Sequence, residues 1–277
     1  MMTHTPVACS LRVAASPLKG ATPVARRSRF HGVSGVGHFA PDGALAASPR
    51  QRIARWAVVV LGLALAACGN NPPTPDWQMN AKGSSERAAN AWLGGNNRVE
   101  AAEFARARSE LARTGRADLL ARIELLRCAT RVAALEFEPC AGFDALAADA
   151  APAEQAYARY LAGGATAADV RLLPPAHQAV AQVVNAPDAA LGAIEEPLSR
   201  LVAAGVLFKR GVATPGVITQ AVDTASAQGW RRPLLAWLKV QQQRAQAGGA
   251  ADEAARIQRR IELVLETGAA TVPAPAK

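Results

Sequence analysis

Histidine is almost absent from this chain. Four histidines occur in 277 residues, and three of them, His4, His31 and His38, precede residue 50. Cysteine is also scarce, with four residues, and aromatic residues make up only 5% of the chain. A zinc site or a Ser-His-Asp triad needs several reactive side chains close together, and the sequence contains no glycine-rich phosphate loop. This scarcity argues against an enzyme and predicts neither a cofactor nor a bound metal.

Beyond residue 67 the chain also lacks an excess of charge of either sign. The formal net charge of +9 arises mostly in residues 1–67, which hold eight basic side chains and one acidic one. The remaining 210 residues hold 23 basic and 21 acidic side chains. Binding to nucleic acid depends on several unbalanced cationic contacts with phosphates. The sequence therefore predicts no nucleic-acid partner.

No apolar run is long enough to span a membrane. The longest one, residues 56–67, has 12 residues and follows Arg50, Arg52 and Arg55. A membrane-spanning helix needs about 20 apolar residues, whereas a basic segment before a short apolar one is typical of a secretory signal peptide. We therefore expect residues 50–67 to be a signal peptide that is cleaved.

The residues that end this apolar run are Leu65, Ala66, Ala67 and Cys68. They resemble the lipobox of bacterial lipoproteins, in which a branched residue and two small ones precede the cysteine. The resemblance implies that Cys68 receives lipid, becomes the new N-terminus and anchors the protein to a membrane. Gly69 at the following position implies passage to the outer membrane, with the protein facing the periplasm.

The signal peptide divides the rest of the chain. Residues 1–49 precede it, and we expect them to be a non-native or disordered extension because signal peptides normally begin near their basic segment. Residues 68–83 begin with a stretch rich in Gly, Asn and Pro and are expected to be a flexible tether. Residues 84–266 are expected to form the folded domain, and residues 267–277 a disordered tail.

The folded domain is predicted to be all-α, because Ala, Leu, Arg, Glu and Gln dominate it and no clear alternating strand pattern occurs. Asn97 and Glu100 have the spacing of a capping box. Pro197, Pro215 and Pro233 stand where helices could begin. Helical hairpins in the second half are spaced about 36 residues apart, which resembles tetratricopeptide-type arrays. We expect either an irregular helical bundle or a short repeat-like array.

Cys128 and Cys140 are predicted to form a disulfide. Cys128 lies about two turns before the expected end of its helix, and five residues returning from that end can span the rise. An exported protein folds in an oxidising compartment, and Cys68 is already consumed by lipid.

Aromatic and basic residues suggest one surface for a partner. Trp230, Arg231 and Arg232 follow a glycine in a hairpin link, and Trp and Arg are frequent in interface hot spots. Trp237 is instead predicted to lie in the core with Leu234 and Leu238.

Other reactive side chains are expected to be structural. His177 has no ligand or catalytic partner at helical spacing and is predicted to be at the surface or half-buried. Tyr157 and Tyr160 are predicted to share one buried helix face. The acidic pairs are expected on solvated faces and at helix ends, since adjacent helical residues do not face each other; these pairs are Glu195 with Glu196 and Glu136 with Glu138.

Taken together, the sequence predicts a lipid-anchored, non-enzymatic interaction or scaffold module of the cell envelope, with an envelope protein as its partner. Two alternatives stay open: a lipoprotein that binds a small ligand between its helices, and an accessory factor that acts on peptidoglycan.

Overall fold

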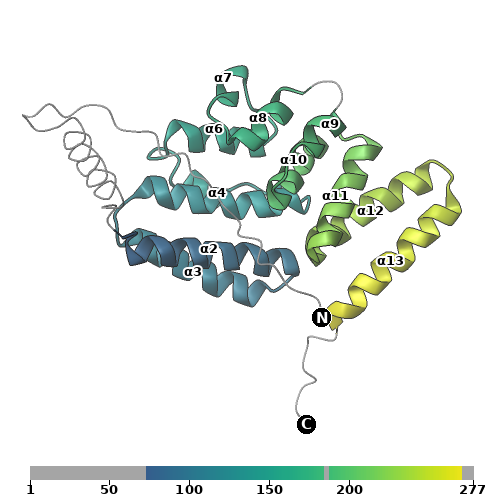
Figure 1. Cartoon of the computed structure of the whole chain (residues 1–277), viewed down its shortest axis with the longest axis horizontal. Coiled ribbons are helices and arrows are strands. Elements are labelled where there is room, and N and C mark those ends of the chain that lie inside the picture. Colours follow the sequence, from purple (N-terminus) through teal and green to yellow (C-terminus); the bar gives the residue numbers. More distant parts are fainter. Residues whose placement is uncertain (1–72, 184–186, 270–277) are drawn as a thin grey trace, which may run out of the picture. The chain divides into compact units, whose positions relative to one another are not determined.

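The described part of this computed structural model covers residues 73–183 and 187–269, with side chains up to residue 266, and it is entirely helical (Figure 1). Its twelve helices are α2 Asp76–Gly94, α3 Asn97–Ala112, α4 Ala117–Ala133, α5 Ala141–Asp144, α6 Pro152–Leu161, α7 Ala167–Val170, α8 Pro175–Gln182, α9 Pro187–Gly192, α10 Pro197–Lys209, α11 Pro215–Gln228, α12 Arg231–Ala247 and α13 Ala251–Ala269. The all-α prediction is confirmed for these residues. The extension, signal peptide, lipobox and Cys68 lie outside them.

The first helix begins earlier than the sequence led us to expect. Helix α2 starts at Asp76, and Ala81, Ser84 and Ser85 on it are buried. The expected tether of residues 68–83 therefore loses its last eight residues to the helical domain, because Ala81 gains apolar contacts that no local pattern indicates. At the other end, α13 continues to Ala269, three residues into the expected tail.

Local sequence explains most helix ends. Pro197 and Pro215 open α10 and α11, as predicted, while Pro233 is the third residue of α12. The capping-box prediction at Asn97 is wrong by one position: the side chain of Asn96 accepts the bond from the Val99 amide at 3.1 Å. The Glu100 side chain does not accept a hydrogen bond from the capping residue, because it is buried and pairs with arginines of α4.

Helices α2, α3 and α4 pack around a small core of their own. The buried residues include Ala81, Phe104, Leu111 and Ile123, and Trp77 at the start of α2 packs against the same cluster. Helices α3 and α4 follow one another and pack together, but α3 makes its main contact with α2.

The main core joins α4 to the second half of the domain. Seven consecutive residues of α10, from Leu201 to Leu207, are buried. Helix α10 packs closely on α4 because Gly205 has no side chain: a Cβ atom there would overlap the carbonyl oxygen of Val132. Trp237 on α12 is fully buried and donates from Nε1 to the carbonyl oxygen of Ala133 at 3.0 Å. The core position predicted for Trp237 is confirmed.

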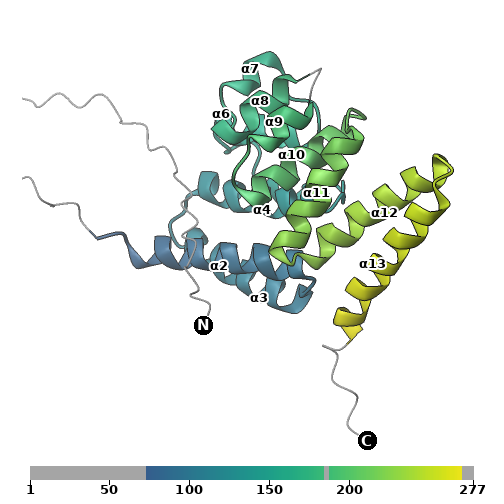
Figure 2. The same ribbon diagram turned by 45° about the vertical axis from the view of Figure 1, so that its right-hand side comes forward.

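The last helices follow one another in a chain of antiparallel neighbours. Helix α11 packs on α10, α12 on α11, and α13 on α12, as Figure 2 shows for the green and yellow helices. Ala254, Ile257 and Ile261 form the buried stripe of α13. The helix thus has one principal neighbour.

A disulfide links Cys128 of α4 to Cys140, the residue that precedes α5, with their Cα atoms 5.9 Å apart. This is the pairing predicted from the sequence. The bond fixes the loop after α4, which doubles back through Leu135, a residue with a positive φ of 61°.

Candidate interaction surfaces

The predicted surface of Trp230, Arg231 and Arg232 lies at a joint between helices. Trp230 is half-buried and packs against Trp92 and Leu93 of α2. The guanidinium of Arg232 lies 4.2 Å from the centroid of the Trp92 ring, and it also donates to Asn97 Oδ1. Only 24% of the Arg232 side chain is exposed. These residues hold α12 against α2, which leaves less free surface for a partner than the sequence suggested.

A second arginine, Arg131 of α4, lies near the same ring. Its guanidinium is 4.9 Å from the Trp92 centroid, and burial lowers the pKa of Arg131 despite its pairing with Glu100. Cation–π contacts strengthen when they are desolvated. Trp92 therefore connects α2, α4 and α12 through two guanidinium groups, and Arg231 lies against Gly95, where a Cβ would crowd its guanidinium.

Five buried carboxylates form a feature that the sequence reasoning missed. Each has a side-chain exposure of 10% or less and pairs with at least one arginine that is more exposed; they are Glu100, Glu103, Glu124, Glu154 and Asp169. A buried carboxylate needs such a partner because desolvation disfavours its charged form. The available signal was the many arginines and acids that alternate along α3 and α4, but spacing alone does not indicate which acid turns inward.

Two of these acids have clearly perturbed acidity. Hydrogen bonds from Arg159, together with the Thr166 backbone amide at 2.8 Å, hold the pKa of Asp169 far below its usual range. The pKa of Glu103 is lowered by its hydrogen bond from Arg87. Both groups stay ionised near neutral pH, so neither is suited to donate a proton.

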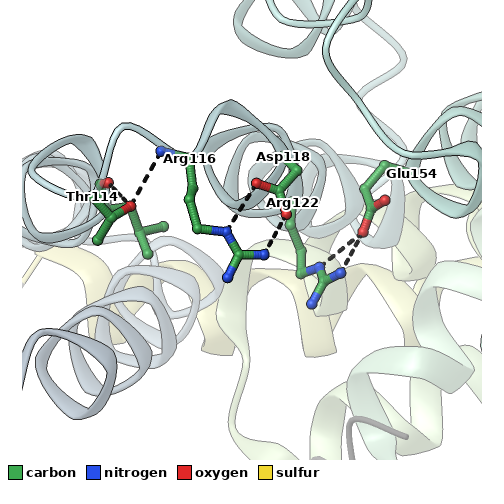
Figure 3. Close-up of polar contacts among 6 residues, drawn as sticks. Thr114, Arg116, Asp118, Arg122 and Glu154 are labelled. Atoms are coloured by element: carbon green, nitrogen blue, oxygen red, sulfur yellow. Dashed lines mark hydrogen bonds and ion pairs between the residues drawn. The ribbon is translucent and has the colours of Figure 1, made fainter. Parts of the chain in front are cut away.

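One acid of each predicted acidic pair, Glu196 and Glu136, also has a structural partner. Glu196 caps α10 by accepting from the Leu198 amide at 3.0 Å, and Glu136 lies 3.9 Å from Arg232. Figure 3 shows the turn between α3 and α4, where Arg116 donates to Asp118 at 2.7 Å and Arg122 donates to Glu154 from two nitrogens. These positions agree with the prediction that such acids serve structure.

His177 is buried, so its predicted position at the surface or half-buried is wrong. Its Nδ1 lies 3.2 Å from the hydroxyl of Tyr160, and its ring lies 5.6 Å from that of Tyr157. Burial lowers the pKa of His177 to about 4. Tyr157 and Tyr160 stack on each other on one face of α6, as predicted, and form an aromatic cover that excludes water from the imidazole. A neutral histidine in this cover is part of the core.

An open hollow lies between α2 and α3, and the sequence reasoning did not find it. Its volume is about 350 Å³, and its lining is mostly polar: Met79, Asn80, Gly83, Ser84 and Arg87 of α2 with Arg106, Ser109 and Glu110 of α3. We call these eight residues the α2–α3 hollow. The small residues of α2 recur three to four positions apart, which is the one signal that could have indicated a depression along this helix.

A second pocket, beneath Trp92 and Phe104, has a volume of about 10 Å³. That is about the space of a single water molecule, and it does not accommodate an organic ligand. Among residues 73–183 and 187–269, no three His, Cys, Asp or Glu side chains gather where they could hold a metal ion. None of the helices in the same ranges is both long and apolar enough to cross a membrane.

A comparison with protein families, curated proteins and solved structures gives no match to this chain. The resemblance of the signal region to bacterial lipoproteins and that of the second half to tetratricopeptide-type arrays thus rest on this sequence alone.

Proposed function

We propose that the mature chain is a lipoprotein of the cell envelope, anchored through lipid on Cys68 and facing the periplasm from the outer membrane. Its helical domain acts as a non-enzymatic scaffold that binds another envelope protein. The lipobox Leu65, Ala66, Ala67 and Cys68 supports the anchor, and an oxidising compartment suits the Cys128–Cys140 disulfide.

The state of the buried acids and of His177, within the described residues, supports a non-enzymatic role. A general acid or base has to reach its substrate in a cleft. Here the five buried carboxylates are held by arginines, and His177 is enclosed by tyrosines. An accessory factor on peptidoglycan would need two carboxylates converging on one cleft, and the α2–α3 hollow has only Glu110.

The observation that carries the binding role is α13. Leu263 and Leu265 on it are 63% and 53% exposed, and the helix packs mainly on α12. The two leucines lie on different sides of the helix, and each exposes apolar area that a partner helix could cover. The irregular packing of the preceding helices favours a bundle over a regular repeat array. The alternative of a small ligand between the helices gains no support from the pocket at Trp92 and Phe104, whose volume is about 10 Å³.

The anchor is tested by mass spectrometry of the N-terminal peptide from membrane-purified protein. We expect a diacylglyceryl and acyl group on Cys68 at the new N-terminus. In a Cys68→Ala variant we expect no cleavage at this site and loss of the lipid. Normal cleavage and membrane retention of that variant would refute the anchor.

The binding role is tested by in vivo photo-cross-linking. We expect a cross-linking amino acid at Leu263 to give a discrete product with one envelope protein, whereas the same probe at Thr219, exposed on α11, gives none. Identical products from both positions, or none from either, would contradict the role of α13.

A further inference from the structure

We propose that the α2–α3 hollow, together with Arg113 and Arg116 of the adjoining turn, faces the membrane and binds the phosphate groups of anionic phospholipids. This inference rests on the proposed anchoring at Cys68. It assigns this part of the domain surface to lipid, whereas α13 is proposed to bind a protein partner.

The charges around the hollow are layered. Arg87 of α2 and Arg106 of α3 both pair with Glu103, and their side chains are 57% and 67% exposed, whereas that of Glu103 is 10% exposed. Two outer cations thus share one inner anion. In each pair the guanidinium is the more exposed partner, so solvent meets the cations first.

The same layering continues at the turn between α3 and α4. Arg113 is 62% exposed over Glu110 at 23%, and Arg116 is 55% exposed over Asp118 at 32%. Figure 3 shows the Arg116 and Arg122 guanidinium groups on one side of α4. Trp77, near the start of α2, packs on the small core together with Leu119 and Leu120 of α4. The turn between α3 and α4 therefore lies near the start of α2.

These arginines retain hydrogen-bond donors. A guanidinium carries five N–H groups, and Arg106 uses Nη1 toward Glu103, while Arg113 uses Nη2 toward Glu110. Phosphate oxygens are the acceptors that suit the remaining N–H groups in paired geometry. The hydroxyls of Ser84 and Ser109 add polar groups to the lining. Met79 is 54% exposed, and its apolar side chain suits the acyl region of the bilayer just beneath the headgroups.

Chain length brings this surface to the bilayer. Asp76 is eight residues from Cys68, a distance of at most about 29 Å even for a fully extended chain. Residues 79–87 of the hollow follow within three turns of α2. A lipid on Cys68 would therefore hold the hollow close to headgroups at high effective concentration. An acidic protein could meet the same arginines, whereas the lipid on Cys68 would keep headgroups beside them at all times.

The test measures arginine accessibility in the lipidated protein. Protein purified from membranes is reconstituted in vesicles of phosphatidylethanolamine and phosphatidylglycerol, or of phosphatidylcholine alone, and labelled with phenylglyoxal. We expect Arg106 and Arg113 to react at least threefold more slowly in the anionic vesicles, and high salt to abolish this protection because it screens phosphate contacts. Arg259, exposed on α13, is the internal control and should react equally in both.

A matched pair of variants tests the charges themselves. In Arg106→Gln/Arg113→Gln we expect Arg116 to react equally fast in both vesicles. In Arg256→Gln/Arg259→Gln we expect Arg116 to keep its protection in anionic vesicles. Circular dichroism verifies that both variants retain the helical fold.

Any one of three other results refutes the proposal. Equal labelling of Arg106 in the two vesicles, with lipid present on Cys68, overturns the inference alone, and so does protection that appears only after an acidic envelope protein is added. Absence of lipid from Cys68 overturns the proposed anchoring and this inference with it.

Discussion

The two halves of the domain are stabilised in different ways. Helices α2–α7 bury five carboxylates and pair them with arginines, and the first three of these helices share a small apolar core of their own. Helices α10–α13 bury aliphatic and aromatic side chains, and within their described residues the only buried polar side chain is that of Thr224. Geometric fit between backbones dominates in the second half, whereas ion pairing dominates in the first. The difference shows that one run of Ala- and Leu-rich helices can follow two packing strategies.

The strongest test of this contrast is a single methyl group. We expect Gly205→Ala to lower the free energy of unfolding by about 3 kcal/mol, because the added Cβ overlaps the Val132 carbonyl and separates α10 from α4. Gly94→Ala in α2 meets nothing within 4 Å and should change stability by less than about 0.5 kcal/mol. Urea denaturation measures both, and equal effects would abolish the contrast.

The disulfide lies within the first half, between α4 and the residue that precedes α5. Replacing Cys128 and Cys140 by serine should lower the free energy of unfolding by about 2–3 kcal/mol, because the loop is released in the unfolded chain. Intact-mass measurement should show a gain of about 2 Da when the wild type is reduced, which corresponds to two thiols. An unchanged mass, or an unchanged urea midpoint in the double variant, would contradict this prediction.

Acid should weaken the fold in two separate pH ranges. His177 has a pKa of about 4 in the fold against 6.5 unfolded, so stability is lost as pH falls from 6.5 toward 4. The expected loss between pH 7 and pH 5 is about 2 kcal/mol. The pKa values of Asp169 and Glu103 are lowered instead, so their contribution is lost only as pH falls below about 4.

A His177→Gln variant separates the two ranges. Glutamine can still hydrogen-bond to Tyr160 but does not titrate, so the loss between pH 7 and pH 5 should disappear while the loss below pH 4 remains. Denaturation curves at these pH values provide the measurement. If the variant loses as much stability as the wild type by pH 5, His177 is not the responsible group.

The smallest expected effect concerns the ion pairs. Arg122→Met should cost about 1–2 kcal/mol, because it leaves the buried Glu154 carboxylate without its only hydrogen-bond donor. Glu154→Gln should cost less than about 1 kcal/mol, since Arg122 is half-exposed and remains solvated. Urea denaturation compares the two. A larger effect of Glu154→Gln would reverse the proposed roles of the inner acid and the outer base.

Much of the fold could be predicted from short-range patterns. Pro197 and Pro215 at helix starts, the stripe of Phe104, Ala107 and Leu111, and the Cys128–Cys140 bond all depend on residues close together in the chain. The helix at residues 76–83 was missed because its evidence is tertiary. Ala81 is buried by α3 and α4, and the prolines before Asp76 suggested a tether.

The candidate surfaces could be predicted only in part. Trp230 and Arg232 were identified as suitable for contact, and their contact is with α2 of the same chain. The α2–α3 hollow was not predicted, since its lining comes from two helices and depends on which faces they turn outward. No pattern within either helix indicates that two arginines share Glu103.

The sequence by itself determined that the described chain is helical, that α10 and α11 begin at Pro197 and Pro215, and which cysteines pair. Hydrogen bonding, capping and loop closure act over a few residues. Only the tertiary structure decided that His177 is buried, that five carboxylates turn inward and that Arg232 bonds to Asn97, 135 residues away. Those outcomes depend on burial, and burial is set by helices distant in sequence that meet in the fold.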